Sequence, residues 1–171
     1  VPATYYSDLE WRTPDRAQVP SVAHVHTGSF AATLEPGATS VLEAIIARRQ
    51  QSSVSYDPNA RPALMHSPDA VLDRIETLIS LSDVAKASDE DLAWLYPGEA
   101  VVEVMRRWTL MGPRLVVVTR GGEGAIALLA SSDEVIDVAP LTVDLVDTVG
   151  AGDSFMAGLI SGLIDAGLLG S

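Results

Sequence analysis

The hydrophobic positions of the chain change repeatedly between the period of a strand and the period of a helix. Short runs of apolar and β-branched residues predict strands at 3–8, 22–26, 53–57, 83–86, 114–119, 125–130 and 135–139. Apolar residues at helical spacing, with capping residues before them, predict helices at 36–50, 67–80, 99–111 and 151–166 and a further helix starting at Ser88. Strands that alternate with helices favour an α/β domain whose sheet is mainly parallel.

The bulk composition narrows the classes of function. The 171 residues suit one globular domain, with 47% hydrophobic and 20% charged residues. A net charge of −12 disfavours nucleic acid as a partner, because an acidic surface repels polyphosphate. Cysteine is absent, which excludes disulfides, thiolate catalysis and cysteine-bound metals and fits a cytoplasmic protein. The apolar run at 155–164 is too short to span a bilayer, so no membrane association is expected.

Both ends of the chain look like cuts. It opens on Val1-Pro2 without an initiator methionine and closes on Gly170-Ser171 without an evident stop. No basic segment precedes an apolar stretch near the start, so a signal peptide is not predicted. We therefore expect one domain over residues 1–171 that is incomplete at both ends.

The strongest chemical signal is the segment Asp147–Phe155, which follows a strand and opens the last helix. Gly150 and Gly152 allow a tight turn, so that successive backbone N–H groups can point at one spot. The first N–H groups of the following helix are unpaired, and the positive end of its dipole faces the same spot. The segment therefore predicts an anion site built from backbone.

Asp153 places a carboxylate at the edge of this anion site. A carboxylate there repels a bound anion, so it needs a chemical reason, and abstraction of a proton from a hydroxyl that attacks a phosphoryl group supplies one. The alternative is that Asp153 only caps the helix while the glycines only turn the chain, and the residues alone leave both interpretations open. The pattern is neither a dinucleotide-binding fingerprint, since Phe155 stands in place of the third glycine, nor a Walker A loop.

The run Asp-Thr-Val-Gly-Ala-Gly-Asp at 147–153 resembles the second signature of the ribokinase/PfkB family of sugar kinases. The resemblance implies that Asp153 is the catalytic base and that the anion hole is formed by the backbone of Gly150, Ala151 and Gly152. It also implies a nucleotide contact for Thr148. A monovalent cation such as K⁺ would be held by Asp147 and the backbone of Val149, as in some relatives.

The stretch 116–125, Val-Val-Val-Thr-Arg-Gly-Gly-Glu-Gly-Ala, resembles the strand and turn that contact the nucleotide phosphates in this family. The resemblance makes Thr119, Gly121 and Gly124 candidates for nucleotide binding. Without it, a hairpin turn with glycines at positive φ is the simpler interpretation.

Two further segments resemble the same family. In 86–91, Ser88 and Asp91 occupy the places of the family's frequent Asn-x-x-Glu, which implies a nucleotide contact for Ser88 and a water-mediated Mg²⁺ contact for Asp91. The loop 56–61 resembles the Asp-x-Asn-x-Arg loop of fructokinase-like members, and its Asn59 and Arg61 become candidate substrate contacts. A helix cap for the first segment and ordinary turn residues for the second are the alternatives.

The resemblance implies a three-layer α/β/α ribokinase-like domain that lacks the N-terminal substrate and lid part and the C-terminal helices. The implied activity is transfer of the ATP γ-phosphoryl group to a hydroxyl of a sugar, fructose or a related ketose, with Mg²⁺. Another sugar or nucleoside kinase and an inactive nucleotide-binding module are the alternatives. A homodimer is left open. His24 and His26 share one strand face, where an edge of the substrate cleft or plain packing is expected rather than a metal site.

Overall fold

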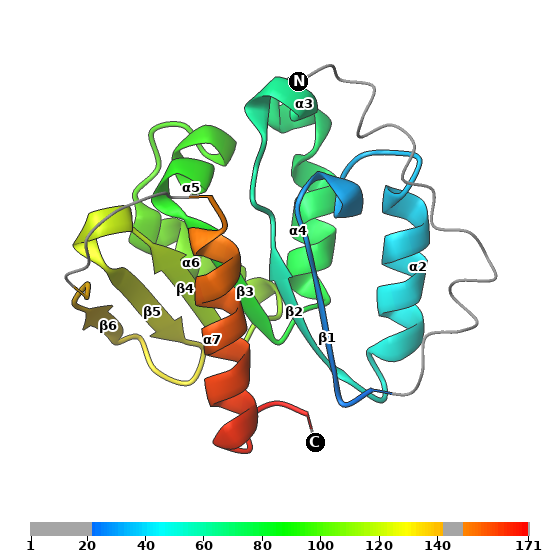
Figure 1. The fold of residues 1–171 in the computed structure, drawn as a ribbon. Coiled ribbons are helices and arrows are strands. Elements are labelled where there is room, and N and C mark those ends of the chain that lie inside the picture. Colours follow the sequence, from blue (N-terminus) through cyan, green and yellow to red (C-terminus); the bar gives the residue numbers. More distant parts are fainter. Residues whose placement is uncertain (1–21, 142–148, 171) are drawn as a thin grey trace.

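The computed structural model describes residues 22–141 and 149–170, so the strand expected at 3–8 lies outside the described residues. Within them six strands form one sheet in the order of the chain (Figure 1). The strands are β1 (His24–Gly28), β2 (Ser53–Asp57), β3 (Val84–Ser88), β4 (Leu115–Thr119), β5 (Ala125–Leu129) and β6 (Val135–Val138). Strands β1 to β4 run parallel, whereas β5 and β6 are antiparallel to their neighbours. The sheet is therefore mixed, with the predicted parallel part extended by an antiparallel ribbon.

Helices cover both faces of this sheet. The helices are α2 (Ala38–Arg48), α3 (Pro62–Met65), α4 (Leu72–Ser80), α5 (Asp89–Leu95), α6 (Val101–Met111) and α7 (Ala151–Asp165), with short 3₁₀ turns at Phe30–Ala32, Pro68–Ala70 and Gly121–Glu123. Helix α7, drawn in orange, crosses the front of the sheet, and α4 and α6 lie behind it (Figure 1). This is the expected three-layer arrangement.

The alternation of strand residues decides which side chains each layer buries. Val54, Ala85 and Val116 point to the side of α2, α4 and α6, where they join a core that includes the fully buried Trp108. Val84 and its neighbours on the opposite face pack against α7 in a smaller cluster with Met156 and Leu169. Burying one large apolar side chain contributes about 1.5–3 kcal/mol, so the first cluster supplies most of the stabilisation.

Two strands extend further toward their carboxyl ends than the sequence predicts. The first runs to Gly28 instead of residue 26, and the third runs to Ser88 instead of residue 86. Strand pairing is the cause, since Gly28 is in register with Asp57, and Ser88 with Thr119. The consequence is that these strands finish at the same end of the sheet, with Gly28 beside Asp57 and Ser88 beside Thr119.

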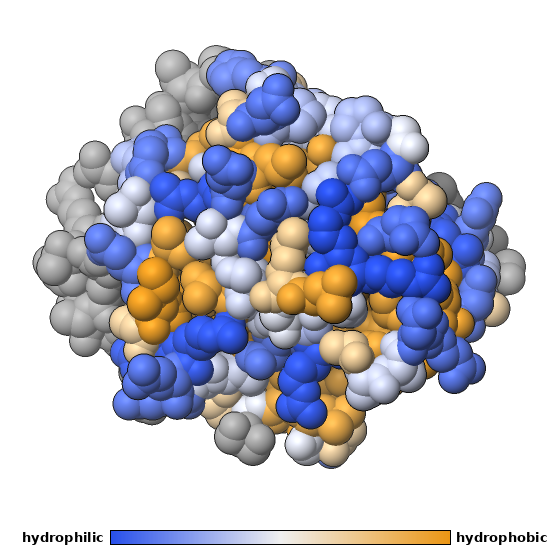
Figure 2. Space-filling view, turned by 180° about the vertical axis from the view of Figure 1, so that it is seen from behind, coloured by the Kyte–Doolittle hydropathy of each residue, from blue (hydrophilic) through white to orange (hydrophobic). Residues whose placement is uncertain are grey.

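The face opposite to that of Figure 1 is of mixed polarity. Hydrophilic and hydrophobic residues are interspersed on it (Figure 2). No helix in 22–141 or 149–170 is long and apolar enough to cross a membrane.

Candidate functional site

A cavity of about 590 Å³ opens at the carboxyl ends of the parallel strands, where ligands bind in open α/β sheets. Its wall is formed by the loop after β2, the end of β3 with the first turn of α5, the end of β4, and the first turn of α7. Nine residues that the sequence singles out line it together: Asn59, Arg61, Ser88, Asp91, Thr119, Gly121, Gly150, Gly152 and Asp153.

The backbone at the start of α7 has the shape expected of an anion site. Gly150 has φ +78°, a left-handed conformation that favours glycine, and it is the residue before the helix. The first hydrogen bond of the helix runs from the N–H of Ser154 to the carbonyl of Gly150 at 2.8 Å. The N–H groups of 151–153 precede this bond, so they have no partner inside the helix. Gly152 lines the cavity, whereas Ala151 does not.

Asp153 is exposed in the first turn of α7 and lines the same cavity. Its carboxylate therefore stands at the positive end of the helix, where an anionic side chain is stabilised. The negative charge of Asp153 also acts on His26 in β1. Burial lowers the pKa of His26, and the charges of Asp57 and Asp153 oppose this decrease. An accessible carboxylate beside unpaired N–H groups is the geometry that a general base next to an anion hole requires.

A buried ion pair lies under this backbone, and the sequence analysis did not identify it as part of the site. The ammonium of Lys86 donates to Oδ2 of Asp57 at 2.9 Å, with both side chains only 5% exposed. Burial raises the pKa of Asp57, and the charge of Lys86 opposes that rise. A Cβ added to Gly152 would lie 3.3 Å from Nζ of Lys86, so the ammonium touches the underside of the turn. The sequence feature that could have indicated this ion pair is a lysine inside the otherwise buried strand Val84–Ser88.

The loop after β2 has an unusual backbone. Asn59 has φ +40°, and its N–H donates to Oδ1 of Asp57 at 3.0 Å. The guanidinium of Arg61 donates to the carbonyl of Ala60 at 3.0 Å, which turns the side chain back over its own loop. Both predicted substrate residues therefore sit on the rim of the cavity, on a loop fixed to its floor.

Ser88 and Asp91 form a capping box at the start of α5, as the sequence predicts. The hydroxyl of Ser88 accepts the N–H of Asp91 at 3.0 Å, and Oδ2 of Asp91 accepts the N–H of Ser88 at 2.9 Å. Oδ1 of Asp91 accepts a third N–H, that of Ala60, at 2.8 Å. Asp91 is 8% exposed and each oxygen already has a donor, so this carboxylate does not fit direct coordination of Mg²⁺.

Only part of the turn after β4 lines the cavity. Thr119 and Gly121 line it, and Gly121 has φ +52°. Gly124, the third candidate of this turn, does not line the cavity; a Cβ there would lie 2.1 Å from the carbonyl oxygen of Val138. The absence of a side chain at Gly124 therefore has a packing reason, the close approach of the end of β6.

Two sequence predictions concern residues that the structure does not describe, Asp147 and Thr148. The two histidines of β1 do not line the cavity; the ring nitrogens of His24 and His26 each lie 2.9 Å from the hydroxyl of Ser55. Burial lowers the pKa of both rings. Among the described residues, no group of three or more histidine, aspartate or glutamate side chains could hold a metal ion.

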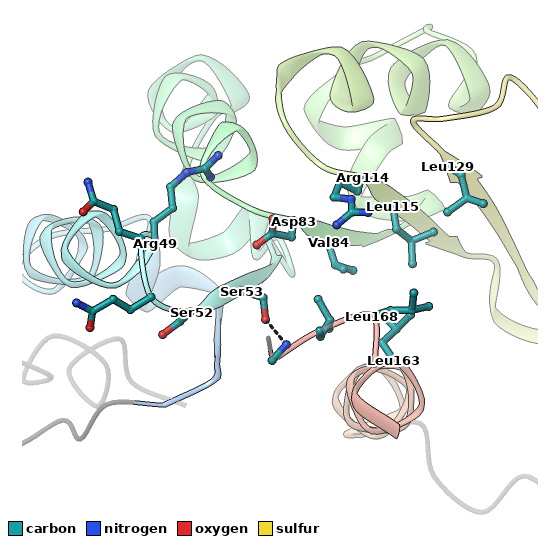
Figure 3. A pocket seen from close by; sticks show the side chains of 14 residues that line it. Arg49, Ser52, Ser53, Asp83, Val84, Arg114, Leu115, Leu129, Leu163 and Leu168 are labelled. Carbon is teal, nitrogen blue, oxygen red and sulfur yellow. Dashed lines mark hydrogen bonds between the residues drawn. The ribbon is translucent and has the colours of Figure 1, made fainter. Parts of the chain in front are cut away.

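A second cavity, of about 410 Å³, lies at the other end of the sheet between the amino ends of the strands and the end of α7 (Figure 3). Arg49, Asp83 and Arg114 line it together with several leucines, and the N–H of Gly170 donates to the hydroxyl of Ser53 at 3.0 Å. None of the residues predicted to carry chemistry belongs to it.

Comparison with known proteins places this chain in a family. The model of the pfkB family carbohydrate kinases matches residues 3–169. The chain is 38% identical over 122 residues to the fructokinase of Rhizobium leguminosarum bv. trifolii, covering 71% of this chain and 37% of that protein. It is 34% identical over 146 residues to the fructokinase of Klebsiella pneumoniae, covering 84% and 47%.

Solved structures show the same relationship. The fructokinase of Vibrio cholerae O395, in its form with bound fructose, ADP and calcium ion, superposes with a TM-score of 0.75 at 30% identity over 86% of this chain and 49% of that one. A PfkB protein of Polaromonas sp. JS666 superposes with a TM-score of 0.73 at 33% identity over 89% and 50%. The chain spans between a third and a half of the length of these curated relatives. The family match over nearly all of the sequence shows that the chain belongs to the pfkB family of carbohydrate kinases.

Proposed function

We propose that the protein transfers the γ-phosphoryl group of ATP to a hydroxyl of a sugar, with fructose or a related ketose as the acceptor. The observation that carries the proposal is the single cavity that contains the unpaired N–H groups of α7, the accessible Asp153 and the loop Asn59–Arg61. The fructokinases among its relatives support the choice of a ketose.

In the proposed reaction Asp153 acts as a general base. It accepts the proton of the attacking hydroxyl while the sugar oxygen forms a bond to the γ-phosphorus and the bond from that phosphorus to the ADP oxygen breaks. The electron pair of the broken bond leaves with ADP. The backbone N–H groups at Gly150, Ala151 and Gly152 would stabilise the negative charge on the transferring group.

The nucleotide would occupy the side of the cavity formed by Ser88, Thr119 and Gly121. Mg²⁺ would enter with the nucleotide phosphates and reduce their negative charge. Sequence resemblance implies a contact between Asp91 and Mg²⁺ through water, but both oxygens of that carboxylate already accept backbone N–H groups, so we expect the nucleotide phosphates to hold Mg²⁺ without it. We propose Thr148 as a nucleotide contact and Asp147 as a K⁺ contact from sequence resemblance alone.

The acceptor would bind on the side of Asn59 and Arg61, opposite the nucleotide. Arg61 supplies a cation at the rim of a cavity that also contains several carboxylates. We propose a cytoplasmic location, where ATP is supplied; the homodimer remains a hypothesis for measurement by light scattering.

The direct experiment is an assay of the full-length natural protein with MgATP and a panel of ketoses, aldoses and nucleosides. ADP formation coupled to a reporter gives kcat/KM for each acceptor, and mass spectrometry confirms the phosphorylated product. We expect fructose or a related ketose to give the highest kcat/KM. Preference for a nucleoside would contradict the proposed acceptor, and no ADP formation with any acceptor would contradict the kinase assignment.

A further inference from the structure

One carboxylate, that of Asp91, connects two segments of the cavity wall, the loop after β2 and the first turn of α5. Oδ1 of Asp91, in the first turn of α5, accepts the N–H of Ala60 in the loop after β2 at 2.8 Å, although the two residues are 31 positions apart. The same carboxylate accepts the N–H of Ser88 through Oδ2 at 2.9 Å. Ala60 and Asp91 are both buried, so water does not compete freely for this contact. Asp91 therefore fixes the position of the loop relative to the start of α5.

The backbone of the loop bends sharply at Asn59. Asn59 has φ +40°, in the left-handed region that asparagine adopts more readily than other non-glycine residues. Asp57 holds the N–H of Asn59 on one side, and Asp91 holds the N–H of Ala60 on the other. Two consecutive N–H groups are thus each held by a buried carboxylate, immediately before Arg61.

We propose that Asp91 is a positioning residue for the phosphoryl acceptor. Its carboxylate sets the place of Asn59 and Arg61 at the rim, rather than serving Mg²⁺, whose direct coordination it does not fit. The inference rests on the proposed kinase function, and it changes the role that sequence resemblance gives to Asp91. Acceptor affinity then depends on a residue that does not contact the acceptor itself but is hydrogen-bonded to the loop that does.

The variant that tests this is Asp91→Asn in the full-length protein. The amide oxygen can replace only one of the two carboxylate oxygens, so either Ala60 or Ser88 loses its acceptor. We expect KM for the sugar to rise about 10- to 100-fold, the factor that corresponds to one lost hydrogen bond to a charged group. KM for MgATP should rise by a smaller factor than KM for the sugar, because Asp91 also accepts the N–H of Ser88 on the nucleotide side, and the Mg²⁺ concentration for half-maximal rate should change less than about twofold.

Two further variants separate positioning from general damage. Asp73→Asn makes the same change in the first turn of α4, away from the cavity, and should leave all three parameters unchanged. Asp91→Glu keeps the charge and the capping-box chemistry but displaces the carboxylate by one methylene, so it should raise the same sugar KM by a smaller factor. A shift of the Mg²⁺ half-saturation with an unchanged sugar KM would overturn the proposal, as would no change in either.

Amide hydrogen exchange tests the contact without any turnover. In Asp91→Ala, which removes both carboxylate oxygens, the N–H of Ala60 should exchange at least about tenfold faster than in the unsubstituted protein or in Asp73→Ala, because it has lost its acceptor. An unchanged exchange rate at Ala60 would contradict the clamp directly. If the unsubstituted protein phosphorylates no acceptor, the kinase assignment fails, and this exchange measurement still decides whether Asp91 holds the loop.

Discussion

At the scale of single residues, Lys86 and Asp57 form a buried ion pair at the candidate site, and burying these two charges costs stability. The 2.9 Å contact between the ammonium of Lys86 and the carboxylate of Asp57 offsets that cost only while both are present. The ammonium of Lys86 lies close to Gly152 in the first turn of α7, and Asp57 accepts the N–H of Asn59. The floor of the cavity therefore depends on one ion pair.

Replacing Lys86 by methionine should leave Asp57 as an uncompensated buried charge. We expect Lys86→Met to lower the free energy of unfolding by about 3–5 kcal/mol, the usual cost of removing one partner of a buried pair. Urea unfolding at pH 7 measures this loss. Arg106→Met is the matched control, because Arg106 forms its ion pairs with Glu103 and Asp133 on the surface and should cost far less. Equal losses for the two variants would contradict a buried role for Lys86.

The histidines of β1 give a prediction on pH. Burial lowers the pKa of His24 and His26, so the unfolded chain binds protons near pH 6.5 that the folded chain does not bind. Stability should therefore fall as the pH drops below about 6.5, and the loss should level off below the lowered folded pKa. The double variant His24→Gln/His26→Gln should show a flatter curve when urea midpoints are compared from pH 7.5 to 5. An identical dependence on pH below 6.5 would contradict the lowered pKa of the two rings.

At the scale of elements, the antiparallel ribbon β4–β5–β6 depends on close backbone contacts. Gly124 has φ +88°, and a Cβ there would lie 2.1 Å from the carbonyl oxygen of Val138. Gly124→Ala should cost about 2–3 kcal/mol, from the strained φ and the displaced end of β6. Gly122→Ala, where a Cβ would meet nothing within 4 Å, should change stability by less than about 0.5 kcal/mol. Thermal melts of both variants test the difference, and similar melting temperatures would refute the contact.

The elements that the sequence predicts well are those whose signal is local. The strand at Ser53–Asp57 and the capped helix start at Ser88 appear where hydrophobic pattern and capping residues place them. The short helix Pro62–Met65 was not predicted, because four residues carry too little periodicity. The pairing of Lys86 with Asp57 and the bond from Ala60 to Asp91 join residues about 30 positions apart, and no local pattern encodes such contacts.

At the scale of the whole molecule, the described chain contains the proposed base, the anion site and part of the acceptor side in one cavity. The chain nevertheless spans about half the length of the Klebsiella pneumoniae fructokinase. Much of the rate enhancement in such reactions comes from holding both substrates in a reactive geometry. We therefore propose that the complete site needs groups beyond those that the structure describes.

This predicts a weak activity for the isolated piece. Residues 1–171, expressed alone and checked for folding by circular dichroism, should turn over at least about 100-fold more slowly than the full-length protein, because the reacting groups are less well positioned. The assay is ADP formation with MgATP and the preferred acceptor. Equal rates would show that the described cavity contains the whole site.

Steady-state kinetics of Asp153→Asn in the full-length protein tests most directly whether Asp153 is the base of a phosphoryl transfer. Asparagine keeps the shape and can still cap the helix but cannot accept the proton, so kcat should fall about 10²–10⁴-fold. KM for ATP should change little, since the loss falls on the transition state, and the melting temperature should stay close to that of the unsubstituted protein. A near-normal kcat would contradict the catalytic role and leave Asp153 as a helix cap.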